Sequence, residues 1–150
     1  MPEITSSARM EHLERLIAFV AGHAETAGFP IKQINEIELA AEEVLVNIFS
    51  YAYPDTKGDV LIKCRVEDDL RLVLEISDNG VPFNILEVPG PDVTADISHR
   101  RVGGLGAFFV KEMADTASYR RKEDRNILML IFHKHRRGVE RQEHAGDVYE

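Results

Sequence analysis

The segment from Leu70 to Ser77 limits most strongly how this chain can fold. Its even-numbered positions are aliphatic up to Ile76, whereas Arg71 and Glu75 stand between them, and such alternation predicts a half-buried strand. Asp78-Asn79-Gly80 follow directly, so the strand delivers a carboxylate and a glycine to its own end, where α/β folds commonly bind ligands. Asn-Gly and Asp-Gly pairs also form ordinary hairpin turns. The segment by itself therefore supports either a ligand site or a plain turn.

Length and composition fit a single globular domain. The chain has 150 residues, of which 44% are hydrophobic and 29% charged, with a formal net charge of −8. This charge argues against direct binding to nucleic acid and favours a partner with basic patches. Cys64 is the only cysteine, which excludes a disulfide framework or a zinc site. The apolar runs are too short for a bilayer and the N-terminus lacks a signal-peptide pattern, so we expect a cytoplasmic protein with no membrane contact.

Hydrophobic periodicity and turn signals predict the remaining elements. Ser6 and Ser7 are candidate N-caps of a first helix. In chain order we expect a short strand over residues 2–5, helices over 10–27 and 32–51, a hairpin of strands over 60–66 and 70–77, a helix over 104–114, and a second hairpin of strands over 116–121 and 126–133. The last strand is apolar on both faces and should be central. This order predicts a two-layer α/β sandwich of the α+β type, with helices on one face of a mixed, mostly antiparallel sheet.

Two segments lack a convincing period. Residues 81–102 contain three prolines and are typical of a lid or binding loop, although a disordered insert would have the same composition. Residues 135–150 are polar and are predicted to form a C-terminal tail. We therefore expect residues 1–134 to form the domain.

The predicted second helix carries two polar residues suited to a binding site. Glu43 and Asn47 are four residues apart and so share one face of the helix, opposite a broad apolar arc. Leu39, Ala40 and Val46 border them, as the walls of a pocket would. A solvated acidic face is the alternative interpretation.

Glycines lead into the predicted third helix in the order Gly103, Gly104, Leu105 and Gly106. Glycines that open a helix suit a phosphate site, because backbone N–H groups and the helix dipole favour an anion there. A plain loop that enters a helix is the alternative. No GxxxxGK[ST] motif is present, which excludes a Walker-type site. Arg100 and Arg101 are the candidate positive charges near the phosphates, unless they are simply solvated.

The chain order of these motifs is Glu-x-x-x-Asn, Asp-x-Gly and Gly-x-Gly. This order resembles the N, G1 and G2 boxes of the GHKL ATPases, and the forms DNGVPF and GGLGAFFVKEMAD are most similar to the anti-sigma-factor serine kinases of bacteria. The resemblance covers roughly residues 4–134. It implies the Bergerat ATP-binding fold, ATP and Mg²⁺ as cofactors, and a homodimer.

The residue types are consistent with the roles that this resemblance implies. Mg²⁺ prefers oxygen ligands, which suits Asn47, and Glu43 would act as the base that accepts a hydroxyl proton. Asp78 would accept a hydrogen bond from the amino group of adenine, and Gly80 would let the backbone approach the base. The remaining nucleotide-binding residues that we expect are Phe83, Gly103, Gly104, Leu105 and Gly106, with Arg100 and Arg101 assisting catalysis.

Three functional classes follow. The favoured one is an ATP-dependent serine/threonine protein kinase that acts as an anti-sigma factor, phosphorylating a small anti-anti-sigma (STAS-type) partner and sequestering a sigma factor. The alternative is a non-catalytic ATP-binding switch, in which nucleotide orders a loop and alters partner binding. The third class, the ATPase portion of a histidine kinase, is disfavoured because no dimerising helical hairpin with a phospho-acceptor histidine precedes the domain.

Overall fold

The computed structural model describes residues 1–87 and 106–135. The predicted tail and most of the predicted loop lie outside these ranges. In chain order the elements are β1 (Glu3–Ser7), a 3₁₀ turn (Met10–His12), α1 (Leu13–Thr26), α2 (Ile31–Asn47), a π-helical turn (Ile48–Ala52), β2 (Asp59–Glu67), β3 (Arg71–Asp78), a 3₁₀ turn (Ile85–Glu87), α3 (Gly106–Met113), β4 (Thr116–Lys122) and β5 (Arg125–His133).

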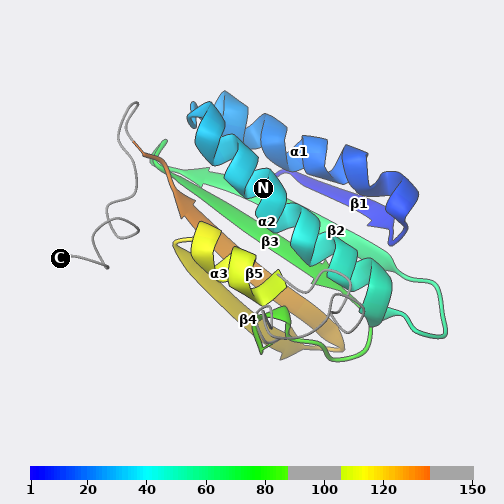
Figure 1. Ribbon diagram of the computed structural model, residues 1–150. Coiled ribbons are helices and arrows are strands. Elements are labelled where there is room, and N and C mark those ends of the chain that lie inside the picture. Colours follow the sequence, from blue (N-terminus) through cyan, green and yellow to red (C-terminus); the bar gives the residue numbers. More distant parts are fainter. Residues whose placement is uncertain (88–105, 136–150) are drawn as a thin grey trace, which may run out of the picture.

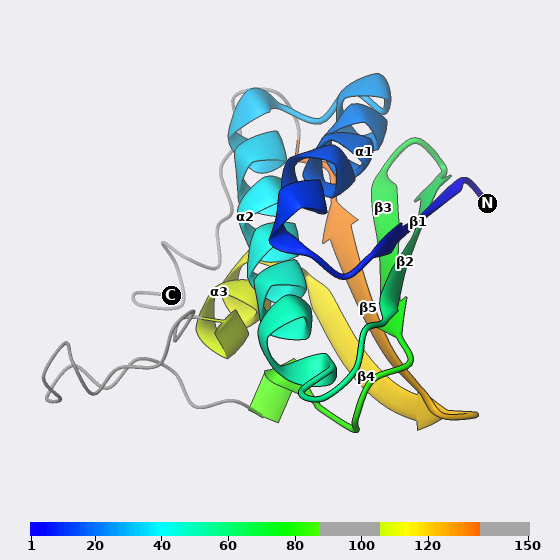
Figure 2. The same ribbon diagram turned by 90° about the vertical axis from the view of Figure 1, so that its right-hand side faces the viewer.

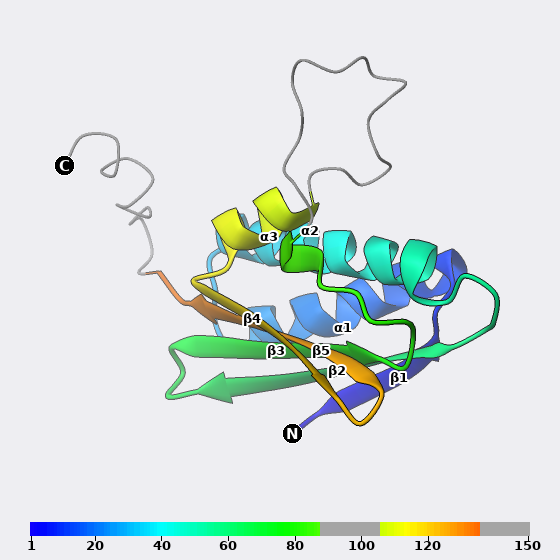
Figure 3. The same cartoon turned by 90° about the horizontal axis from the view of Figure 1, so that it is seen from below.

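The five strands form one sheet in the order β1-β2-β3-β5-β4, and every neighbouring pair is antiparallel. The helices α1, α2 and α3 of the described residues lie on one face of this sheet (Figures 1 and 2). Seen from below, the helices and the strands separate into two layers (Figure 3). The predicted two-layer α+β architecture is confirmed, and β5 is internal as its apolar sequence predicted. The sheet was expected to be mixed, but among the described strands it is entirely antiparallel.

The connection after β3 decides between the two interpretations of Asp78-Asn79-Gly80. β3 pairs with β2 through a turn at Asp68 and Asp69, which have φ values of 55°, and on its other side it pairs with β5. The chain leaves the sheet after Asp78 instead of folding back on β3. The Asp-Asn-Gly segment is therefore not a hairpin turn.

The core lies between the sheet and the helices. Its largest fully buried side chains come from the helices α1 and α2 and from the strands β2, β3 and β5: Leu16, Ile37, Leu45, Ile62, Leu72, Leu74, Ile76, Leu130 and Phe132. On α2 the predicted apolar arc is buried throughout. Leu70 was expected in the alternating strand, but it is 57% exposed, because β3 begins only at Arg71.

The start of the first helix differs from the prediction. Ser6 and Ser7 belong to β1, where they pair with Val60 and Asp59, so they do not cap a helix. A 3₁₀ turn precedes α1, and neither helical segment has a side-chain cap. Among the described residues, no helix is both long and apolar enough to cross a membrane.

Candidate functional site

The carboxylate of Asp78 lies at the end of β3 and is only 4% exposed. Its Oδ1 atom accepts hydrogen bonds from the backbone N–H of Gly80 and from Nδ2 of Asn126, both at 2.8 Å. Within residues 1–87 and 106–135, no hydrogen bond reaches Oδ2. One oxygen of the carboxylate is thus occupied, and the other is available to a ligand.

Asp78 forms part of the wall of a hollow between α2, the sheet and the segment after β3. The hollow encloses about 300 Å³ of empty space, including the part that is open to solvent. Its lining residues are mostly apolar: Val44, Ile48, Ile76, Asp78, Phe83, Ile85, Tyr119, Asn126 and Leu128. An apolar cleft with a few convergent polar groups is typical of a small-molecule site.

Burial raises the pKa of Asp78 above its ordinary value. The hydrogen bonds from Asn126 and Gly80 and the positive charges of Arg121 and Arg125 act in the opposite direction. Four groups thus partly offset the cost of holding a negative charge at this position.

The Asp-Asn-Gly segment is fastened to the end of the second helix. The N–H of Val81 donates to the carbonyl oxygen of Ala52 at 2.8 Å, and a Cβ atom on Gly80 would lie 2.2 Å from the same oxygen. Only glycine permits this contact with the π-helical turn that ends at Ala52. Gly80 thus has a structural role in addition to the predicted approach of a base to its backbone, which stays a prediction.

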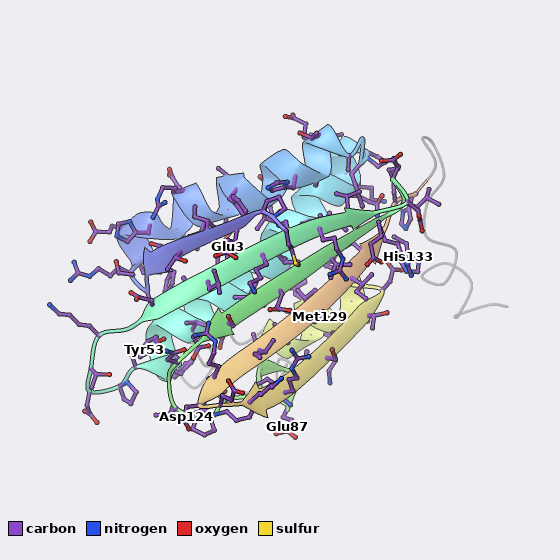
Figure 4. The ribbon with its side chains drawn as sticks, turned by 180° about the vertical axis from the view of Figure 1, so that it is seen from behind. Glu3, Tyr53, Glu87, Asp124, Met129 and His133 are labelled. Atoms are coloured by element: carbon purple, nitrogen blue, oxygen red, sulfur yellow. The ribbon has the colours of Figure 1, made fainter. Side chains whose placement is uncertain are left out.

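Tyr53 provides a second link to the same segment. Its hydroxyl accepts a hydrogen bond from the N–H of Asn79 at 2.8 Å and donates one to the carbonyl oxygen of Asp59 at 2.6 Å. Tyr53 lies at one end of the sheet, where the turn between β4 and β5 also lies near Asp124 (Figure 4). The end of β3 at Asp78 is therefore held by the segment that follows α2 and by both neighbouring strands.

Asn47 and Glu43 form a pair on α2. Nδ2 of Asn47 donates to the backbone oxygen of Glu43 at 2.7 Å and to its Oε2 at 3.2 Å. Asn47 lies outside the apolar arc of the helix, as the sequence predicted, but it is only 1% exposed, which argues against the alternative of a solvated face at this position. Burial raises the pKa of Glu43, the hydrogen bond from Asn47 lowers it, and the nearby Glu42 raises it.

Oδ1 of Asn47 is buried and has no hydrogen-bond partner among the described residues. Leaving a buried acceptor unpaired costs about 1–3 kcal/mol, so such atoms in folded proteins usually serve a ligand, an ion or a water. A lone amide oxygen suits Mg²⁺, which keeps several waters and takes few protein ligands. The described residues contain no group of three or more His, Cys, Asp or Glu side chains arranged for a metal. Asn47 therefore fits a metal held mainly by a nucleotide.

The other predicted site residues divide into two groups. Phe83 lines the hollow, and its ring lies 5.8 Å from that of Tyr51, while Gly106 begins α3. The remainder lie outside the described residues, and their predicted roles are not tested: Arg100, Arg101, Gly103, Gly104 and Leu105.

Sequence reasoning missed three residues of the second hairpin. Oδ1 of Asn126 accepts from the hydroxyl of Tyr119 at 2.6 Å and from Arg121 at 3.2 Å, and Arg121 also donates to the carbonyl oxygen of Gly80 at 2.7 Å. The available signal was a polar residue, Asn126, directly before the apolar run of the strand. It became informative only when the register placed Asn126 opposite Asp78.

Known proteins share both the sequence pattern and the fold. The family model for the histidine kinase-like ATPase domain matches residues 6–132. A protein named serine-protein kinase RsbW from Bacillus cereus (strain AH187) is 28% identical over 134 residues, which cover 87% of this chain and 83% of that protein.

Two solved structures resemble the chain at low sequence identity and so show the fold. The crystal structure of the RsbU and RsbW domains of a Mycobacterium tuberculosis protein has a TM-score of 0.63 at 14% identity, and the match covers 91% of this chain and 33% of that one. A blue-light-activated histidine kinase from Erythrobacter litoralis has a TM-score of 0.51 at 17% identity, with 81% and 40% covered. This chain thus spans well under half of either structure's chain.

Proposed function

The chain belongs to the histidine kinase-like ATPase domain family, and from this membership we propose that it is an ATP-dependent serine/threonine protein kinase. It transfers the γ-phosphoryl group of ATP to a hydroxyl group on a small partner protein. The 28% identity with proteins named serine-protein kinase RsbW supports this activity.

The pairing of Glu43 with Asn47 is the observation that carries the proposal. Asn47 holds Oε2 of Glu43 at 3.2 Å while its own Oδ1 stays unpaired among the described residues. A metal held by this oxygen would neutralise charge on the phosphates. Glu43, one turn earlier on the same helix, is then placed to accept the proton of the attacking hydroxyl. Its burial raises its pKa and makes it a better base than an exposed carboxylate.

The hollow beside Asp78 receives the adenine. The free Oδ2 of Asp78 accepts a hydrogen bond from the exocyclic amino group, and the apolar walls from Ile48, Ile76 and Leu128 contact the faces of the base. Arg100, Arg101, Gly103, Gly104, Leu105 and Gly106 hold the phosphates, as their order in the sequence predicts.

We further propose the regulatory role that the resemblance to anti-sigma kinases implies. The substrate is an anti-anti-sigma protein of the STAS type. The kinase itself is a cytoplasmic homodimer that sequesters a sigma factor. A net charge of −8 favours partners with basic surfaces.

Transfer of label from γ-³²P-ATP tests the kinase activity. The wild type, Glu43→Gln and Glu42→Gln are each incubated with Mg²⁺ and candidate STAS-type proteins, and the labelled residue is identified by mass spectrometry. Glu42→Gln makes the same charge change on the same helix at an exposed position.

We expect the wild type and Glu42→Gln to label a serine or threonine of the partner. Glu43→Gln should be slower by about 10²–10⁴-fold, as is typical when a general base is lost. If the wild type binds ATP but transfers no phosphoryl group, the function is that of the non-catalytic ATP-binding switch and not that of a kinase.

A further inference from the structure

The side chain of Asn126 makes five hydrogen bonds around the end of β3. Its Nδ2 donates to Oδ1 of Asp78 and to the carbonyl oxygen of Val81, both at 2.8 Å. Its Oδ1 accepts from the hydroxyl of Tyr119 and from Arg121, and from the N–H of Phe83 at 3.2 Å. With an exposed fraction of 5%, this amide has little contact with solvent.

These partners fix the orientation of the amide. Every neighbour of Oδ1 is a donor, and every neighbour of Nδ2 is an acceptor. Exchanging the two atoms would set oxygen against the acceptors of Asp78 and Val81, and N–H groups against the donors of Phe83 and Arg121. The hydroxyl of Tyr119 could still accept a hydrogen bond, but four of the five bonds would be lost. Asn126 can therefore only present a donor to Asp78.

A fixed donor on one oxygen of Asp78 has two consequences. It favours the ionised carboxylate over the protonated acid, because an N–H donor stabilises the charged form. It also leaves Oδ2 as the oxygen that faces a ligand. An ionised Oδ2 can only accept a hydrogen bond, which matches the amino group of adenine, whereas a protonated carboxyl group could donate to the oxygen that guanine carries at the same position.

We propose that Asn126 is a positioning residue for nucleotide recognition, which keeps Asp78 a pure acceptor and thereby makes the site select adenine over guanine. This inference rests on the proposed binding of ATP in the hollow. Asn126 acts through Asp78, and Tyr119 and Arg121 on β4 hold it in place.

Other charged and titratable groups near Asp78 also affect its ionisation. Arg121 on β4 and Arg125 on β5 favour the charged form, and Arg125 is itself held by Ser77 at 2.7 Å and by Asn79. The phenol of Tyr53 lies on the helix side, bonded to the N–H of Asn79. Arg125 and Tyr53 make no hydrogen bond to Asn126 among the described residues, and Arg121 keeps its bond to the carbonyl oxygen of Gly80 at 2.7 Å when the amide is removed. A change in titration therefore reports mainly the lost amide.

The test measures the affinity for ATP and for GTP as a function of pH in the wild type and Asn126→Ala. Gln33→Ala is the matched control, since Gln33 is also a buried amide, 6% exposed. It bonds to the backbone of His133 and His135 at 2.8 Å. His133 lies at the opposite end of β5 from the turn near Asp124 (Figure 4).

In the wild type and in Gln33→Ala, ATP affinity should fall on acidification with the same midpoint. In Asn126→Ala the pKa of Asp78 rises, so the midpoint should move up by about one pH unit or more. The preference for ATP over GTP should fall by up to about tenfold at pH values between the midpoints of the wild type and of Asn126→Ala. Protonation of the ligand phosphates is common to all three proteins and cancels in the comparison.

An equal loss of affinity at every pH, with the ATP preference retained, would show a purely structural role and overturn the inference. If Asn126→Ala does not fold, Asn126→Asp keeps the acceptors for Tyr119 and Phe83 and loses only the donors. Two adjacent carboxyl groups should then shift the midpoint further upward, and an unshifted midpoint again contradicts the inference. Absence of ATP binding by the wild type would instead refute the proposed function itself.

Discussion

Asp78 and Asn126 are 48 residues apart in the chain, yet they lie directly opposite each other in the register of β3 and β5. The hydrogen bond between their side chains joins the ends of two central strands. A β-sheet fixes such pairs closely, because a shift of one residue would turn every side chain to the other face. The sheet thus supplies the rigidity that a recognition carboxylate requires.

Asp78→Asn should invert the hydrogen-bonding character of the hollow. The new amide oxygen can keep the bonds from Gly80 and Asn126, which turns the NH₂ group toward the ligand. ATP affinity should fall by about 10- to 100-fold, since a bond to a charged group is lost and two donors face each other. The ratio of GTP to ATP affinity should rise.

Calorimetry with both nucleotides and Mg²⁺ measures these affinities. Asp69→Asn makes the same charge change in the exposed turn between β2 and β3 and should bind as the wild type does. An unchanged ATP affinity in Asp78→Asn would show that Asp78 does not take part in binding the nucleotide.

Asn47→Leu should separate folding from ligand binding. It removes a buried oxygen that has no partner among the described residues, and the size of the side chain is nearly kept. We expect the free energy of unfolding of the nucleotide-free protein to stay within about 1 kcal/mol of wild type or to rise. The increase in melting temperature that Mg²⁺ and ATP together produce in the wild type should be largely lost. A full increase in the variant would show that Asn47 is not a ligand.

Glu43→Gln should keep nucleotide binding while it loses phosphoryl transfer. The amide has the size of the carboxylate but cannot accept the hydroxyl proton. Its Kd for Mg²⁺-ATP, measured by calorimetry, should remain within about threefold of wild type. Weak binding of Mg²⁺-ATP by Glu43→Gln would mean that Glu43 contributes to nucleotide binding and does not act only in the transfer step.

Gly80→Ala should destabilise the fold, because its Cβ would lie 2.2 Å from the oxygen of Ala52. Backbone atoms cannot move aside cheaply, and such crowding costs about 1–3 kcal/mol. Gly22→Ala in α1 is the control, with no atom within 4 Å of the added Cβ, and it should stabilise the helix by about 0.5–1 kcal/mol. Urea unfolding measures the stability of both variants. A free energy of unfolding of Gly80→Ala equal to that of the wild type would mean that the oxygen of Ala52 does not restrict the residue at position 80.

The local elements were predictable because each has its own periodic signal. The alternating strand before Asp78 and the apolar arc of α2 were both confirmed. Leu70 continues the alternation in the sequence but not in the structure, because the turn at Asp68 and Asp69 delays the start of β3.

Burial of Asn47 and the role of Asn126 could not be predicted in the same way. α2 packs against α1 and also against α3, so a residue outside its apolar arc can still be buried. The hydrophobic periodicity of α2 does not reveal that a second helix packs against it. The contact of Asn126 depends on strand register between distant segments. Its neighbours Ile127 and Leu128 gave only the signal of an apolar strand.

A crystal structure with Mg²⁺ and a non-hydrolysable ATP analogue tests the central claim most directly. We expect the exocyclic amino group of adenine within about 3 Å of Oδ2 of Asp78. Oδ1 of Asn47 should lie about 2.1 Å from the metal, with Glu43 facing the terminal phosphate. Nucleotide bound away from Asp78, or a metal whose ligands do not include Asn47, would contradict the account.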